Sequence, residues 1–83
     1  MSNVVVVLLF GAAADRAGTR RTEVPVDDGT TLGELWPVLA DRHPGLVPMR
    51  DTLAFAVNGE YARLDDAVSA GDEVAVLPPV SGG

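Results

Sequence analysis

The sequence predicts an α+β domain in which one main helix packs on a mixed sheet of four to five strands. Three observations predict it: an apolar run at residues 4–10, a capped amphipathic segment at 31–42, and a hairpin signal at Asn58-Gly59. A chain of 83 residues matches a single domain, and its 47% hydrophobic content is typical of a folded protein. The expected order is strand, strand, helix, strand, strand, strand, which favours two layers.

The first quarter of the chain predicts two strands separated by a short helical turn. Residues 4–10 predict a strand buried on both faces, because four valines follow one another and no polar residue interrupts the run. The run is too short to cross a bilayer, and no positive charge precedes it, so we expect neither a membrane span nor a signal peptide. Residues 12–17 predict the helical turn, which Gly18 closes. Residues 20–26 alternate between apolar and polar, and Pro25 favours an edge strand.

The main helix is predicted from its N-terminal cap and its apolar face. Thr31 and Glu34 match a capping box. The apolar positions that follow recur at helical spacing and form one stripe: Leu32, Leu35, Trp36 and Leu39. Pro37 predicts a kink and not a break, because the carbonyl that its ring would strike belongs to Gly33. Residues 43–45, His-Pro-Gly, end the helix.

The second half predicts three further strands, at residues 53–57, 61–64 and 73–77. Asn58-Gly59 joins the first two as a tight hairpin. Residues 46–52 predict one irregular turn, and residues 65–68 predict a short 3₁₀ turn. Because Pro78 and Pro79 cannot continue a ladder, we expect the domain to span residues 1–78 and residues 79–83 to form a flexible tail.

Composition excludes several classes of function. The net charge is −6, all six basic residues are arginines, and the chain has no lysine and no cysteine. An acidic domain without a basic stripe is a poor nucleic-acid binder, so we expect no nucleic-acid partner and no membrane partner. Without cysteine, the chain has neither disulfides nor thiolate metal sites. We therefore expect no bound metal or cofactor, a cytoplasmic location, and favourable association with a basic protein surface.

Several side chains that could suggest other chemistry have simpler interpretations. Trp36 falls on the apolar stripe of the main helix and is expected in the core. His43 has no accompanying ligand cluster, so a capping or solvated role is favoured. The acidic pairs at residues 27–28 and 65–66 lie in turn signals, which favours turn chemistry over paired catalytic carboxylates.

The C-terminal segment carries a family resemblance. Asn58-Gly59-Glu60 is followed by Gly-Asp-Glu-Val-Ala-Val-Leu at residues 71–77 and by Pro-Pro-Val-Ser-Gly-Gly at residues 78–83. With the order of elements, this stretch resembles the MoaD/ThiS family of sulfur carriers, above all its MoaD branch, the small subunits of molybdopterin synthase. The resemblance covers essentially the whole chain and implies a ubiquitin-like β-grasp fold.

The resemblance also implies a reaction cycle. An E1-like adenylating enzyme of the MoeB/ThiF type uses ATP to adenylate the Gly83 carboxylate, and a sulfur donor protein converts it into a thiocarboxylate. The large synthase subunit, of the MoaE type, then receives the charged tail. In this cycle the chain is not catalytic alone and is the sulfur-donating subunit of a two-subunit synthase. Gly83 is the covalent site, and the residues that partners recognise in the tail are Pro78, Pro79, Val80, Ser81 and Gly82.

The resemblance further places an apolar partner patch at Phe10 and Leu77. We expect Val80 to lie on the same exposed patch, where it leads into the tail. Two departures from the family pattern concern this region. Leu77 stands where the family often has an aromatic residue, and Ala14 stands where it commonly has arginine, with Arg16 two positions later. A partner salt bridge at that place is therefore an open question.

Other functions remain open from the sequence. The chain could carry sulfur for another pathway, such as thiamine thiazole, cysteine or a secondary metabolite. A ubiquitin-like protein modifier or a plain binding module is a further alternative. A self-contained enzyme is disfavoured, because the sequence shows no nucleophile–base pair and no metal set.

Overall fold

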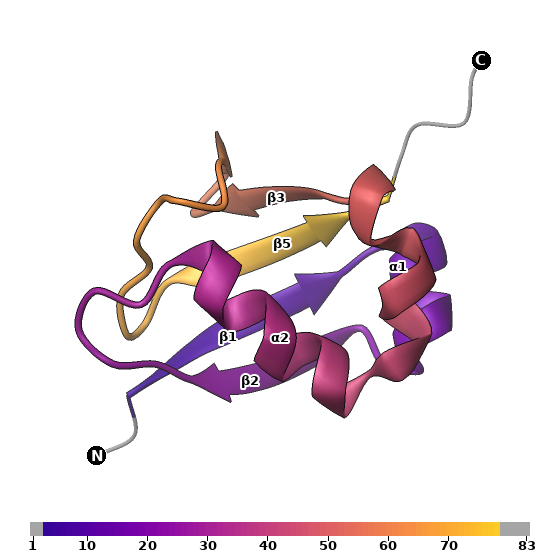
Figure 1. The fold of residues 1–83 in the computed structure, drawn as a ribbon, viewed down its shortest axis with the longest axis horizontal. Coiled ribbons are helices and arrows are strands. Elements are labelled where there is room, and N and C mark those ends of the chain that lie inside the picture. The colour runs from indigo at the N-terminus through magenta and orange to yellow at the C-terminus, as the bar shows by residue number, and fades with distance from the viewer. Residues whose placement is uncertain (1–2, 79–83) are drawn as a thin grey trace.

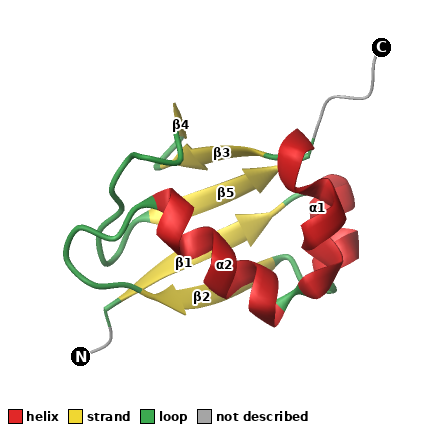
Figure 2. Cartoon of the chain, in the orientation of Figure 1, coloured by secondary structure: helices red, strands yellow, loops and turns green. Residues whose placement is uncertain are grey.

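The computed structural model describes residues 3–78 and shows a five-stranded mixed sheet in the order β2-β1-β5-β3-β4 (Figures 1 and 2). It confirms the predicted α+β fold with one main helix. The elements are β1 (Val4–Leu9), α1 (Gly11–Ala17), β2 (Arg21–Pro25), α2 (Leu32–Arg42), the 3₁₀ helix η1 (Pro44–Thr52), β3 (Ala54–Val57), β4 (Glu60–Ala62) and β5 (Glu73–Leu77). No helix in residues 3–78 is long and apolar enough to cross a membrane.

Strand β1 lies inside the sheet, antiparallel to β2 and parallel to β5. Its burial alternates: Val5, Val7 and Leu9 are at most 2% exposed, whereas the intervening side chains are only half-buried. The prediction that this strand is buried on both faces is therefore wrong. Helix α2 covers one face of the sheet (Figure 2), so only the residues on that face are buried in the core.

Helix α2 begins and continues as its sequence predicts. The backbone N–H of Glu34 donates to the Thr31 hydroxyl at 3.2 Å, and the N–H of Thr31 donates to the Glu34 carboxylate at 3.0 Å. This confirms the capping box. The helix runs through Pro37 to Arg42, so the proline does not end it. The stripe that packs on the sheet is fully in the core: Leu32, Leu35, Trp36 and Leu39.

The short first helix and the β2 edge strand also follow the prediction. Helix α1 ends at Gly18, whose φ of 77° and N–H bond to the Ala14 carbonyl close the last turn. Strand β2 is a sheet edge, with Val24 buried and Pro25 exposed. Trp36 packs edge-to-face on Phe55 in the core, with ring centroids 6.2 Å apart, which confirms its predicted structural role.

Two connections differ from the prediction. Residues 46–52 are not one irregular turn but most of the nine-residue η1, because Leu46 is fully buried and anchors this segment to the core. Residues 65–68 do not form a 3₁₀ turn: Ala67 makes an isolated bridge with Thr31, and the Val68 N–H donates to the Thr30 carbonyl at 2.8 Å. These contacts join distant segments, which local sequence patterns do not reveal.

The hairpin between β3 and β4 is as predicted, although β4 is shorter than expected and ends at Ala62. Asn58 and Gly59 both have positive φ, 51° and 87°. This is the backbone conformation of the tight turns that match the twist of paired strands.

Candidate functional site: the open face and the end of β5

The candidate site lies where β1 and β5 end. Because these strands are parallel, their C-terminal ends meet at one edge of the sheet. Leu9 pairs with Val76, and the Phe10 N–H donates to the Val76 carbonyl at 3.3 Å, so Phe10 lies beside Leu77. Phe10 is 45% exposed and Leu77 is half-buried. The structure thus brings together two of the residues that the sequence places in a partner patch.

Pro78 follows β5 directly and is the last residue that the structure describes. It is half-buried and approaches Gly11, the first residue of α1. The remaining predicted site residues lie outside the described part of the chain: Pro79, Val80, Ser81, Gly82 and Gly83. These residues follow Pro78, whose position after the end of β5 the structure describes.

A row of apolar side chains crosses the sheet on the face away from α2. The register pairs Leu8 with Ala75, Ala75 with Ala56, and Ala56 with Tyr61, so these four residues lie side by side on one face. We call this surface, together with Val6 and Leu77, the open face. Tyr61 is 81% exposed. An aromatic side chain this exposed beside other apolar groups is typical of a protein–protein interface.

Tyr61 and Leu8 were not predicted as site residues. The hairpin at Asn58-Gly59 could have placed Tyr61 opposite Ala56, because a two-residue turn determines the register of its strands. The position of Leu8 depends on the parallel pairing of β1 with β5, which is a long-range contact.

A groove with a volume of about 470 Å³ lies beside the open face at the end of β1. Its lining includes Leu8, Phe10, Ala14, Asp15 and Arg20. Arg16, which the sequence analysis considered for this place, is not among its lining residues. The positively charged residue that lines the groove together with Ala14 is Arg20, just before β2.

The site offers apolar surface for contact with another protein. The open face is apolar at its centre, and the register adds charged neighbours on the same face: Arg21 beside Leu8, and Glu23 and Glu73 beside Val6. No group of three metal-ligating side chains occurs in the stretch from residue 3 to residue 78. A surface of this kind recognises another protein by apolar contact, with the charged groups Asp15 and Arg20 at its margin.

The sequence of the chain matches a family model and is similar to proteins of known function. The ThiS family model matches residues 7–83. The molybdopterin synthase sulfur carrier subunit of Homo sapiens is 40% identical over 82 residues, covering 95% of this chain and 93% of that protein. Small archaeal modifier protein 1 of Haloferax volcanii is also 40% identical, over 83 residues, covering 90% of this chain and 95% of that protein.

Solved structures share the fold over nearly the whole chain. The crystal structure of SAMP1 from Haloferax volcanii superposes with a TM-score of 0.87 at 38% identity, covering 96% of this chain and 99% of that chain. A complex of subunits 1 and 2 of molybdopterin-converting factor from Helicobacter pylori contains a similar chain, with a TM-score of 0.71 at 27% identity and coverage of 96% and 99%. On this evidence the chain belongs to the ThiS family, the sulfur-carrier family that its own C-terminal sequence resembles.

Proposed function

We propose that the chain is a sulfur carrier that donates sulfur in molybdopterin synthesis as the small subunit of a two-subunit synthase. The observation that carries the proposal is the position of Leu77 and Pro78. Strand β5 ends beside the exposed Phe10, so the chain leaves the domain at the margin of an apolar face. A partner that covers this face would lie next to Pro78, the residue from which the last five residues of the sequence continue.

In this function the chemistry takes place on the Gly83 carboxylate. A carboxylate oxygen attacks the α-phosphorus of ATP, pyrophosphate leaves, and an acyl adenylate forms. Sulfide then attacks the acyl carbon, the C–O bond to AMP breaks, and a thiocarboxylate remains, with no change of oxidation state. The activating enzyme of the MoeB/ThiF type binds ATP and supplies the catalytic groups. The absence of cysteine from the chain supports this route, because the sulfur must come from a donor.

The partner surface is proposed on the open face. A similar chain occurs in complex with a second subunit of molybdopterin-converting factor from Helicobacter pylori, which supports a synthase large subunit of the MoaE type as the partner. The apolar side chains Leu8, Tyr61 and Leu77 would supply the centre of the contact, and the groove at Ala14 and Arg20 would lie at its margin.

The proposal is tested by mass spectrometry of the intact protein. The chain is incubated with an E1-like activating enzyme, ATP and sulfide, in parallel with a carrier known to be charged by that enzyme. We expect the oxygen-to-sulfur mass increase of the intact chain, and none without ATP or when one residue is added after Gly83. A charged reference carrier beside an unmodified chain would refute the proposal.

A protein modifier is the second candidate, because small archaeal modifier protein 1 is as similar to the chain as the human carrier subunit is. Both functions begin with adenylation of Gly83. A carrier then transfers a sulfur atom to its acceptor, whereas a modifier transfers its C-terminal acyl group to an amine. Supplying the charged chain with a synthase large subunit and a pterin precursor, or with a lysine-containing protein acceptor, separates them. Dithiolene formation supports the carrier, and an isopeptide-linked product supports the modifier.

A further inference from the structure

The outer edge of β2 has a regular pattern of backbone groups that points away from the sheet. Among the strands in the described residues, β2 pairs with β1 alone and forms one edge of the sheet. The N–H of Leu9 donates to the Arg20 carbonyl at 2.9 Å. The backbone N–H and C=O groups of the even-numbered residues from Arg20 onward therefore point toward β1. Because residues alternate along a strand, the outward backbone groups are those of the odd-numbered positions Arg21, Glu23 and Pro25.

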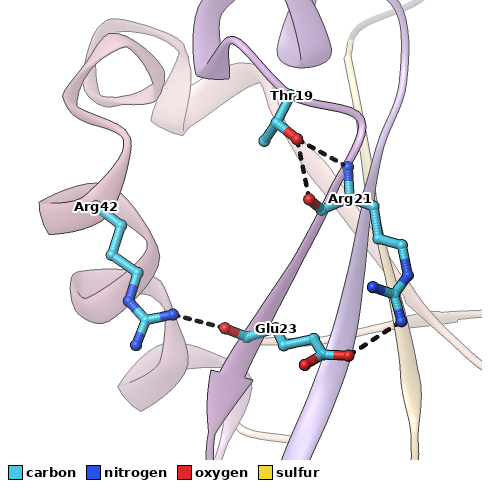
Figure 3. Close-up of polar contacts among 4 residues, drawn as sticks. All are labelled: Thr19, Arg21, Glu23 and Arg42. Atoms are coloured by element: carbon cyan, nitrogen blue, oxygen red, sulfur yellow. Dashed lines mark hydrogen bonds and ion pairs between the residues drawn. The ribbon is translucent and has the colours of Figure 1, made fainter.

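The hydroxyl of Thr19 is hydrogen-bonded to both backbone groups of Arg21 that point away from the sheet, its N–H and its carbonyl (Figure 3). It donates to the Arg21 carbonyl at 2.9 Å and accepts from the Arg21 N–H, with 3.3 Å between nitrogen and oxygen. Thr19 lies in the connection between α1 and β2, two residues before the groups that it occupies. Neither backbone group of Arg21 is therefore available to a neighbouring strand.

The side chain of Arg42 occupies the next outward carbonyl. It extends from the last turn of α2, and its Nη1 donates to the Glu23 carbonyl at 2.6 Å (Figure 3). Pro25 has no N–H to offer. Of the outward groups along β2, only the Glu23 N–H and the Pro25 carbonyl are left without such a contact in the described residues. A pairing strand needs successive donors and acceptors, so this edge is closed.

The opposite edge of the sheet needs less protection. Strand β4 has three residues, and its end residues pair with Val57 and Phe55 of β3. The Asn58 N–H donates to the Glu73 carbonyl at 2.8 Å, so the backbone groups of Asn58 point toward β5. Because residues alternate, the backbone groups of Val57 and Phe55 point toward β4. Within β4, only Tyr61 therefore has backbone groups that point away from the sheet. Strand β2, with five residues, is the edge long enough to pair with another strand.

We propose that Arg42 and Thr19 are edge guards, which prevent β2 from pairing with β2 of a second copy of this chain. The second copy is the occupant that the sequence of β2 favours. In an antiparallel pair in which Thr22 lies opposite Thr22 of the second copy, Arg21 of each copy would lie opposite Glu23 of the other. This arrangement forms two pairs of opposite charges. This role goes beyond the proposed carrier function, because it concerns self-association and requires no sulfur chemistry.

The test removes the two guards and measures self-association. Arg42→Met keeps an apolar stem without donors, and Thr19→Val keeps the shape of threonine without its hydroxyl. The control is Arg50→Met, which removes the same charge from the last turn of η1. Sedimentation velocity is recorded at increasing concentration, after circular dichroism has shown that each variant is folded. The original chain, the control and Arg42→Lys should stay monomeric, whereas the weight-average mass of the double variant should rise toward twice the monomer value.

A third substitution locates the contact. Glu23→Pro removes the N–H in the middle of the outer edge, so adding it to the double variant should restore the monomer. In the dimer, hydrogen exchange at the Arg21 and Glu23 amides should slow at least tenfold. A folded double variant that stays monomeric, or a dimer that survives Glu23→Pro, overturns the proposal. If the double variant does not fold, Arg42→Met alone is measured with the same two criteria.

Discussion

Gly11 and Pro78 meet at the point where the chain leaves the sheet. A Cβ atom on Gly11 would lie 3.2 Å from Cγ of Pro78, closer than most side chains pack. Gly11 also has a φ of 52°, in the region that favours glycine. The start of α1 and Pro78 are therefore close neighbours, so a side chain added at position 11 would press against Pro78.

Substitution of Gly11 by alanine is expected to disturb this contact. The positive φ should cost about 1–2 kcal/mol of stability, and the new methyl group should displace Pro78. Gly18→Ala is the matched control, because Gly18 has a φ of 77° and open space where its Cβ would be. We expect both variants to lose thermal stability, but only Gly11→Ala to slow the formation of thiocarboxylate. Equal charging rates for the two variants would contradict a role for the contact.

Tyr61 is expected to contribute to partner binding and not to folding. Its side chain is 81% exposed, so Tyr61→Ala should leave the free energy of unfolding nearly unchanged. If the large subunit covers the open face, the affinity should fall roughly tenfold or more, which is about 1.4 kcal/mol. Val38→Ala is the control, since Val38 is 40% exposed on α2, which covers the other face. Isothermal titration calorimetry compares the two, and equal loss of affinity would place the contact elsewhere.

The capping box at Thr31 is expected to stabilise the domain measurably. Thr31→Ala removes the acceptor of the Glu34 N–H and should lower the free energy of unfolding by about 1 kcal/mol. Thr31→Ser keeps the hydroxyl and should recover most of that loss. Urea denaturation followed by circular dichroism measures both variants. Equal stability of the two would show that the hydroxyl contributes little.

His43 is expected to join the end of α2 to α1. Its Nδ1 lies 3.1 Å from the Ala17 carbonyl oxygen, to which an N–H at this position donates. His43→Ala should cost about 1 kcal/mol, because the partly buried carbonyl loses its donor. His43→Asn places an amide donor at a similar distance along the side chain and should retain part of the stability. Thermal unfolding of the three proteins distinguishes this bond from simple loss of volume, which both substitutions share.

The elements that the sequence predicted correctly depend on neighbours in the chain. The capping box of Thr31 and Glu34, the closure of α1 at Gly18 and the hairpin at Asn58-Gly59 each involve residues at most four positions apart. Their geometry is determined by local backbone chemistry, so the pattern was sufficient. The family resemblance of the C-terminal segment is likewise a property of contiguous residues.

The predictions that failed concern contacts between distant segments. The four valines of β1 suggested burial on both faces, but only α2 packs on the sheet there, and one face stays partly accessible. The bridge of Ala67 with Thr31 and the burial of Leu46 also depend on segments that meet only in the folded chain.

By itself the sequence determined the five strands and the two α-helices, where α2 begins, and that an apolar strand is followed by a Gly-Gly end. The tertiary structure decided what surrounds the end of β5. The parallel pairing of β1 with β5 brings Phe10 beside Leu77, and the sheet order places Tyr61 and Leu8 in one row. The physical reason is that local propensities act over a few residues, whereas strand order results from burying one apolar face under α2.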